Sequence, residues 1–228
     1  MINLLSNLKI SVPEKIFIKD PESSNLGKRI IEHSILLIDE VGFDSFTFKK
    51  LGETIGSNES SIYRYFESKH KLLLYLTSWY WAWVEYQMVF ATYNIANSED
   101  QLKRAITVVT KTVEQDQSFS HINEVVLNRI VINEYSKSYL TKEVDMENKD
   151  GYFVVYKRLI KRINDMILAV NPKYKYALSL ASTVVYGALH QHFLKAHFSS
   201  ITNCNDEITP TSFFTNLTLT ALNSKSNG

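Results

Sequence analysis

The chain has 228 residues, of which 45% are hydrophobic and 21% charged, and its formal net charge is +1 at pH 7. This balance is ordinary for a globular protein and lacks the bulk positive charge of many nucleic-acid binders, so any basic surface must be local. Only 7 Gly and 4 Pro argue against a turn-rich all-β fold, and the single cysteine, Cys204, excludes an internal disulfide or a cysteine-based metal cage and fits a reducing cytosol.

Residues 1–24 contain Pro13 and Pro21 and predict an irregular N-terminal arm. The arm holds no continuous apolar run of the kind found in signal peptides, and no stretch of the chain approaches the roughly 20 apolar residues needed to cross a bilayer. We therefore expect a cytoplasmic protein with no membrane partner.

Helical spacing of apolar residues runs through most of the remaining chain, and no period-2 run is long enough to indicate a strand. A capping-box pattern at Ser98 opens one helix, polar residues 141–151 form a connection, and Pro172 and Pro210 each follow a capping residue. The other expected helices are 26–41, 47–56, 58–66, 68–94, 120–139, 152–170, 172–198 and 210–222. The sequence thus predicts an all-α protein.

Two short helices between residues 47 and 66 are joined by a tight turn. Thr47 can cap the first helix, Gly56 can end it with a positive φ, and Asn58 can cap the second. Such a pair is a helix-turn-helix, whose second helix enters the DNA major groove. At 100° per residue, Ile62 and Phe66 share a face that should pack on the first helix. The opposite face presents Ser60, Ser61 and Arg64, flanked by Tyr63 and Tyr65, and these side chains can hydrogen-bond to base edges or phosphates.

This segment resembles the TetR family of transcriptional regulators. The family pattern places a Thr at the start of the first short helix, a Gly at the turn, a small residue and Tyr in the second, and then Tyr-x-His-Phe-x-Ser-Lys. Here the pattern stands as Thr47, Gly56, Ser61, Tyr63, Phe66, Ser68 and Lys69. Gly52 replaces the usual Ala, Ser57 the usual Val and Tyr65 the usual His.

The resemblance implies a DNA-binding head and a larger helical domain for ligand binding and dimerisation. The expected divisions are the arm 1–24, the head 25–68, the helical domain 69–223 and a disordered tail 224–228. It also implies that Thr47, Tyr63, Tyr65 and Lys69 touch phosphates while Ser60, Ser61 and Arg64 face bases. Lys49 adds a positive charge where backbone contacts would form. Packing against the helix expected at 26–41 is the alternative for Tyr63 and Tyr65, and a solvated charge is the alternative for Arg64 and Lys69.

The charge of the head weighs against tight DNA binding. Residues 24–75 contain seven basic and seven acidic residues, whereas strong binders show a basic footprint. Three functions therefore remain open. The favoured one is a repressor that an unknown small-molecule effector releases from an inverted-repeat operator. The second is a ligand- or protein-binding module on the same fold without DNA binding, and the third is an all-helical enzyme.

Aromatic residues recur along one face of the fourth helix, at Trp79, Trp83 and Tyr86. They form either a buried core or the lining of a pocket for an apolar or flat small molecule, and the resemblance favours some pocket in this domain. No phosphate-binding loop or other enzymatic motif is present, so we expect neither catalysis nor a cofactor.

Small residues among large ones in the two last helices predict a four-helix homodimer interface, with an intramolecular core as the alternative. The expected interface residues are Leu180, Val184, Gly187, Gln191, Phe213 and Leu217. His190, His192 and His197 lack the i, i+4 spacing of a helical zinc site, so no metal is expected.

Overall fold

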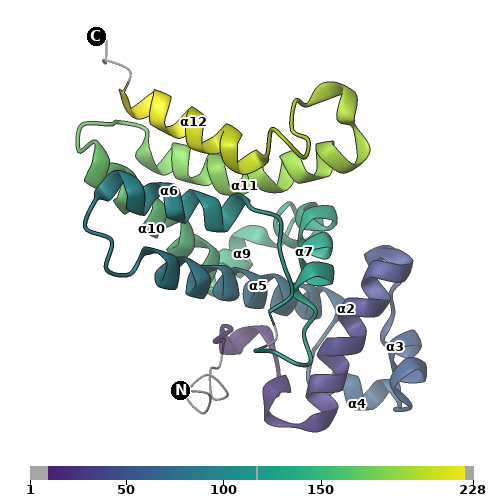
Figure 1. Ribbon diagram of the computed structural model, residues 1–228. Coiled ribbons are helices and arrows are strands. Elements are labelled where there is room, and N and C mark those ends of the chain that lie inside the picture. Colours follow the sequence, from purple (N-terminus) through teal and green to yellow (C-terminus); the bar gives the residue numbers. More distant parts are fainter. Residues whose placement is uncertain (1–9, 117, 224–228) are drawn as a thin grey trace. The chain divides into compact units, whose positions relative to one another are not determined.

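The computed structural model describes residues 10–116 and 118–223, and every regular element in these ranges is a helix (Figure 1). The all-α prediction is therefore confirmed for the described part of the chain. The short 3₁₀ elements are η1 (Glu14–Ile16), η2 (Pro21–Ser23) and η3 (Ser199–Ile201). The α-helices are α2 (Asn25–Ser45), α3 (Phe48–Ile55), α4 (Glu59–Tyr63), α5 (Lys69–Thr92), α6 (Ser98–Thr110), α7 (Glu124–Asn133), α8 (Tyr135–Tyr139), α9 (Val144–Lys149), α10 (Val154–Val170), α11 (Ala177–His197) and α12 (Pro210–Asn223).

The chain divides into two compact units. The first comprises residues 1–82 and 113–155, and the second comprises residues 83–112 and 156–228. In the first unit α2 packs against α3, α7 and η2, and Ile30, Ile31 and Ile35 of α2 are completely buried. Burying one such side chain stabilises the fold by about 1.5–3 kcal/mol. The head and domain limits expected from the sequence remain predictions.

In the second unit α6, α11 and α12 lie side by side (Figure 1). Gly187 of α11 permits a close approach, because a Cβ atom there would lie 2.6 Å from Cζ of Phe214 in α12. The buried carboxylate of Glu85 receives hydrogen bonds from Arg158 at 2.6–2.9 Å and from Arg162 at 2.5 Å. The thiol of Cys204, which follows η3, is buried and free.

Three helices begin at other residues than the sequence predicts, α6 one residue earlier and the two others later. Asn97 rather than Ser98 caps α6, with its Oδ1 2.9 Å from the amide nitrogen of Asp100. Asn123 caps α7, so the helix expected from Ser120 starts at Glu124. The helix expected from Pro172 starts at Ala177, because Asn171 uses its side chain to bind the Leu222 carbonyl and the Lys173 amide instead of opening a helix.

Other ends agree with the prediction. Gly42 and Gly56 have positive φ values of 76° and 60°, and Thr209 caps α12 by accepting a hydrogen bond from the Ser212 amide at 3.1 Å. Within the described ranges no helix has the length and apolarity needed to cross a membrane. The disordered tail expected at 224–228 lies outside the described residues, as does the start of the predicted arm.

Candidate nucleic-acid interface

Local hydrogen bonds define the turn between α3 and α4. The Thr47 hydroxyl accepts a hydrogen bond from the Lys50 amide at 3.2 Å and starts α3, which ends at Gly56 in the left-handed conformation. Asn58 then caps α4, with its Oδ1 2.9 Å from the Ser61 nitrogen. The three residues chosen from the sequence as caps and turn therefore take those roles.

The turn also explains Gly52. The Ser57 amide donates to the Gly52 carbonyl at 2.8 Å, which folds the turn back onto α3. A Cβ atom at residue 52 would lie 2.7 Å from the carbonyl oxygen of Ser57. The absence of a side chain thus permits this close approach, so Gly52 is more than a weak point in a helix.

The inner face of the helix-turn-helix is apolar and closed. Ile62 and Phe66 are completely buried, and Leu51 and Ile55 of α3 are at most 2% exposed. The guanidinium of Arg29 in α2 also donates to the Ile55 carbonyl at the end of α3. These contacts confirm the inner face predicted from the helical spacing, although α4 ends at Tyr63 and not at Phe66.

The outer face of α4 is polar. Ser60 and Arg64 are exposed, Ser61 is partly exposed and Tyr63 is 46% exposed. Both serine hydroxyls donate to Oδ1 of Asn58, at 2.8 Å from Ser60 and 2.6 Å from Ser61. The Tyr63 ring packs edge-on against Phe48, with the ring centroids 5.0 Å apart, while the residue as a whole remains 46% exposed. Four predicted DNA-facing side chains are thus brought together on one surface.

Thr47 and Lys49, at the start of α3, are exposed as well. Thr47 accepts the capping bond through its hydroxyl oxygen, and its hydroxyl proton remains available to an acceptor. These two side chains keep the accessibility that the predicted phosphate contacts require.

Two predicted phosphate contacts need correction. Tyr65 is only 4% exposed, and its hydroxyl lies 2.8 Å from the Ser24 hydroxyl at the start of α2. Lys69 places its ammonium group 3.0–3.2 Å from the carbonyl oxygens of Phe43, Asp44 and Phe46. Because an ammonium has three N–H groups, these carbonyls satisfy it fully. Both residues join α2 to the segment that follows α4.

Cations from outside the head offset part of its acidic charge. Arg129 of α7 binds Asp39 through two hydrogen bonds of 2.6 and 3.0 Å, and Lys137 of α8 lies 2.8 Å from Asp44. The hydrogen bond and charge of Lys137 lower the pKa of the exposed Asp44 carboxyl. The balanced charge counted over residues 24–75 therefore understates the positive character of this region. Both partners lie about 90 residues away along the chain, so no local pattern identifies them.

The aromatic residues of α5 are largely interior. Trp79 and Trp83 are 1% exposed; Trp79 meets Phe119 edge-on at 5.2 Å. Tyr86 is partly exposed and packs against Phe90 at 4.7 Å. A ligand pocket at these residues remains a prediction.

Of the six predicted dimer residues, two are buried in the chain, two contact other residues of the same chain and two are exposed. Val184 is completely buried and Leu180 is 9% exposed, so both belong to the core of the single chain and are corrected. Gly187 faces Phe214, and the Gln191 amide oxygen accepts a hydrogen bond from the Thr202 hydroxyl at 2.6 Å. Phe213 and Leu217 remain exposed. Leu178 and Tyr186 of α11, which the sequence pattern did not select, are also exposed.

A helix-turn-helix with a closed apolar back and a polar outer face defines a DNA-binding head fold. Residues 30–76 match the family model for bacterial regulatory proteins of the tetR family, which confirms the resemblance stated above for this segment. No curated protein sequence matches the chain significantly.

Solved structures share the fold along most of the chain. PfmR, a TetR family transcriptional regulator from Thermus thermophilus, is 13% identical with a TM-score of 0.54, covering 85% of this chain and 97% of that one. AibR in complex with isovaleryl coenzyme A and operator DNA is 14% identical with a TM-score of 0.52, covering 86% and 97%. The superantigen PfiT is 17% identical with a TM-score of 0.59, covering 91% and 100%. The chain therefore has the fold of the TetR-family regulators.

Proposed function

We propose that this protein is a cytoplasmic transcriptional regulator that binds an operator in double-stranded DNA through α4. The observation that carries the proposal is the outer face of α4, where Ser60, Tyr63 and Arg64 are exposed while Ile62 is completely buried behind them. A polar helical face held out from an apolar base is the arrangement by which a recognition helix reads the major groove.

The accessible side chains suggest a division of roles. Arg64 can bind guanine O6 and N7 through two hydrogen bonds, and Ser60 and Ser61 can contact base edges. Thr47, Lys49 and Tyr63 would contact phosphates and set the position of the head on the duplex. Tyr65 and Lys69 would act indirectly, by fixing the position of α4.

We further propose that the regulator is a homodimer on an inverted repeat. A dimer carries two DNA-binding heads, which match the two half-sites of such an operator. In each chain α11 and α12 expose large apolar side chains that a second copy could cover, namely Leu178, Tyr186, Phe213 and Leu217.

Control by a small molecule completes the proposal. An effector held among the helices that follow the head, near Trp79, Trp83 and Tyr86, would shift α5, which follows the head directly in the chain. The altered spacing of the two heads would release the operator and end repression. AibR, which shares the fold, has been solved with an acyl coenzyme A and operator DNA together.

Fluorescence anisotropy with labelled DNA from beside the gene tests DNA binding. We expect Arg64→Ala to weaken specific binding by about 10- to 100-fold, since a bidentate base contact contributes about 1–3 kcal/mol. Arg104→Ala, which removes an exposed arginine of α6, is the matched control and should leave affinity unchanged. Equal affinities for both variants would refute the assigned role of α4.

The second candidate function is a ligand- or protein-binding module that no longer binds DNA. It is favoured by the balanced charge of residues 24–75 and by the internal use of the Lys69 ammonium. The TetR-like fold is shared with a superantigen, so the fold alone does not imply DNA binding. Absence of binding to any fragment of the neighbouring DNA, even at low salt, would favour this candidate.

A further inference from the structure

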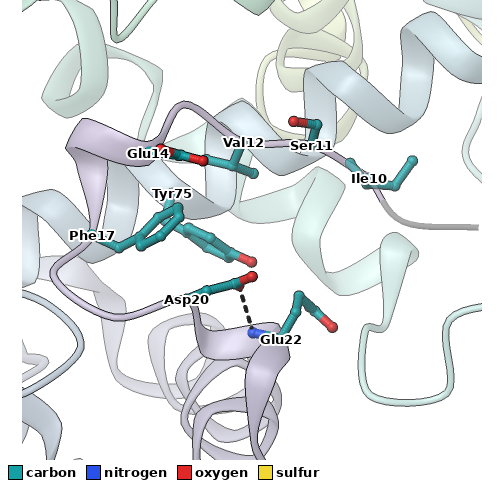
Figure 2. Close-up of a pocket in the computed structure, with 8 residues that line it drawn as sticks. All are labelled: Ile10, Ser11, Val12, Glu14, Phe17, Asp20, Glu22 and Tyr75. Atoms are coloured by element: carbon teal, nitrogen blue, oxygen red, sulfur yellow. Dashed lines mark hydrogen bonds between the residues drawn. The ribbon is translucent and has the colours of Figure 1, made fainter.

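The side-chain oxygen of Asn58, the residue before α4, receives three hydrogen bonds. This oxygen lies 2.9 Å from the Ser61 amide nitrogen, 2.8 Å from the Ser60 hydroxyl and 2.6 Å from the Ser61 hydroxyl. Elsewhere in the described ranges, side-chain oxygens cap helical turns by accepting a backbone amide, as Asp20 does for Glu22 at 2.9 Å (Figure 2). At Asn58 two serine hydroxyls are held in addition to the capping bond.

The capping bond determines which end of the Asn58 amide faces the two serines. A backbone N–H can only donate, so the atom beside the Ser61 nitrogen must be the amide oxygen and not the NH2 group. Because an amide oxygen has no proton, the hydroxyls of Ser60 and Ser61 both donate to it. A hydroxyl has a single proton, and what remains is its lone pairs. Both serines therefore present hydrogen-bond acceptors to the outside of α4.

The residue between the cap and the serines has the same polarity. Glu59 is partly exposed, and its carboxylate can only accept. Ser60 is exposed and Ser61 partly exposed, so the side chains of three consecutive residues offer acceptors at the start of α4. Arg64, which is also exposed, offers donors only. The outer face of α4 thus combines one donor side chain with a group of acceptors.

The four bases differ in what they offer to such a surface in the major groove. Adenine N6 and cytosine N4 carry amino groups that donate, whereas guanine O6 and thymine O4 accept. A serine whose proton is bound to Asn58 can accept from an amino group at once. To contact guanine O6 or thymine O4, the same hydroxyl would first have to give up its bond to Asn58.

We propose that Asn58 is a positioning residue that determines base specificity. It holds Ser60 and Ser61 as acceptors, so the operator bases opposite them carry an exocyclic amino group, which means adenine or cytosine. Arg64 would read a guanine of the same half-site with its donors. The inference rests on the proposed DNA-binding function and adds the class of base that each side chain reads. Because Asn58 acts through the serines, its loss should change base preference as well as affinity.

Selection from a pool of randomised DNA duplexes with the full chain identifies the preferred sequence. In the enriched duplex each adenine is then replaced by purine and each cytosine by pyrimidin-2-one, which lack the amino group. We expect fluorescence anisotropy to show binding weakened about tenfold at one or two positions of each half-site, the scale of one lost base contact. Equal affinity for every substituted duplex would overturn the proposal while leaving DNA binding established. Absence of any enriched sequence would refute the DNA-binding function itself, and this inference with it.

Two variants of Asn58 separate its effect on the serines from its role as a helix cap. Asn58→Asp keeps oxygens that can accept all three hydrogen bonds, so it should retain the preference for the amino groups although its negative charge weakens binding overall. Asn58→Ala frees both hydroxyls to donate, so removal of the same amino groups should weaken its binding by less than about threefold. A base preference of Asn58→Ala equal to that of the unaltered protein would show that Asn58 serves as a cap and nothing more.

Two further variants control for folding. Ser60→Ala leaves the bond between Asn58 and the Ser61 amide in place and should remove the amino-group preference at one base position, so it decides the question even if Asn58→Ala folds poorly. Asn97→Ala removes the comparable cap of α6, whose Oδ1 lies 2.9 Å from the Asp100 amide, and should leave base preference unchanged. Retention of every preference by Ser60→Ala would refute the assigned role of its hydroxyl.

Discussion

The close contact between Gly187 and Phe214 should decide whether a methyl group added at residue 187 stabilises or destabilises the protein. A Cβ atom at residue 187 would lie 2.6 Å from Cζ and 3.0 Å from Cε1 of the Phe214 ring. Carbon atoms in contact prefer separations of about 3.5–4.0 Å, so the ring would have to move by about 1 Å. Phe214 is only 3% exposed, which leaves the ring little room to move.

Two opposing effects determine the result of Gly187→Ala. Alanine favours the helix by about 1 kcal/mol, whereas overpacking a closed core costs about 1–3 kcal/mol. We expect a net loss of about 1 kcal/mol of unfolding free energy. In a Phe214→Leu background the obstructing ring atoms are absent. The same substitution should then stabilise the protein by about 0.5–1 kcal/mol.

Urea unfolding followed by circular dichroism measures all four members of this cycle, with the slope of the transition checked for constancy. Thr183→Ala, at an exposed position of the same helix, controls for helix propensity alone and should stabilise both backgrounds by a similar small amount. The argument predicts a change of sign for Gly187→Ala and a coupling energy of about 1–2 kcal/mol. An effect of the same sign and size in both backgrounds would show that the ring does not restrict this position.

Three further predictions concern charged groups, each measured by urea unfolding. Burial raises the pKa of Glu124 to about 7, so the folded state loses stability as pH rises from about 4.5 through 7. Glu124→Gln should increase the unfolding free energy by about 1–2 kcal/mol at pH 8 and reduce its dependence on pH. Parallel pH profiles of the two proteins would contradict this. Burial alone would raise the pKa of Glu85, but the bonds and charges of Arg158 and Arg162 lower it; Glu85→Gln should therefore cost about 1–2 kcal/mol at pH 7 and less as pH falls below 4, and a pH-independent loss would argue against the ion pairs. Lys69→Met should cost about 1–2 kcal/mol by leaving the α2 carbonyls without their donor, and an unchanged midpoint would show that water replaces it.

The structure of the helix-turn-helix could be predicted from the sequence because it depends on interactions between neighbouring residues. Thr47, Gly56 and Asn58 form the caps and turn through hydrogen bonds that span at most four residues. The buried inner face of the helix-turn-helix was predicted from the α-helical period of 3.6 residues. A capping residue or a helical period depends only on close neighbours, so no knowledge of tertiary structure was needed.

The failures lie where a distant residue decides. Tyr65 fits an outer face by its angle on a helix, but α4 ends at Tyr63, and the Ser24 hydroxyl, 41 residues earlier, binds Tyr65 instead. Asn171 and Pro172 carry a local helix-start pattern, yet the Leu222 carbonyl takes the Asn171 amide. The polar stretch 141–151 predicted a connection, but it contains α9. Glu147 of α9 is buried, and the polar sequence around it gives no sign of this.

The buried thiol of Cys204 can be used to measure how often one half of the molecule opens. Cys204 is 6% exposed, and its backbone amide is bound to the Thr202 hydroxyl at 3.0 Å. A thiol-specific reagent can therefore modify it only when this region opens. Because Cys204 lies in the unit formed by residues 83–112 and 156–228, the labelling rate under native conditions reports the opening of that unit. A perturbation confined to the other unit, such as Lys69→Met, would leave the rate unchanged if the two units open independently and accelerate it if they open together.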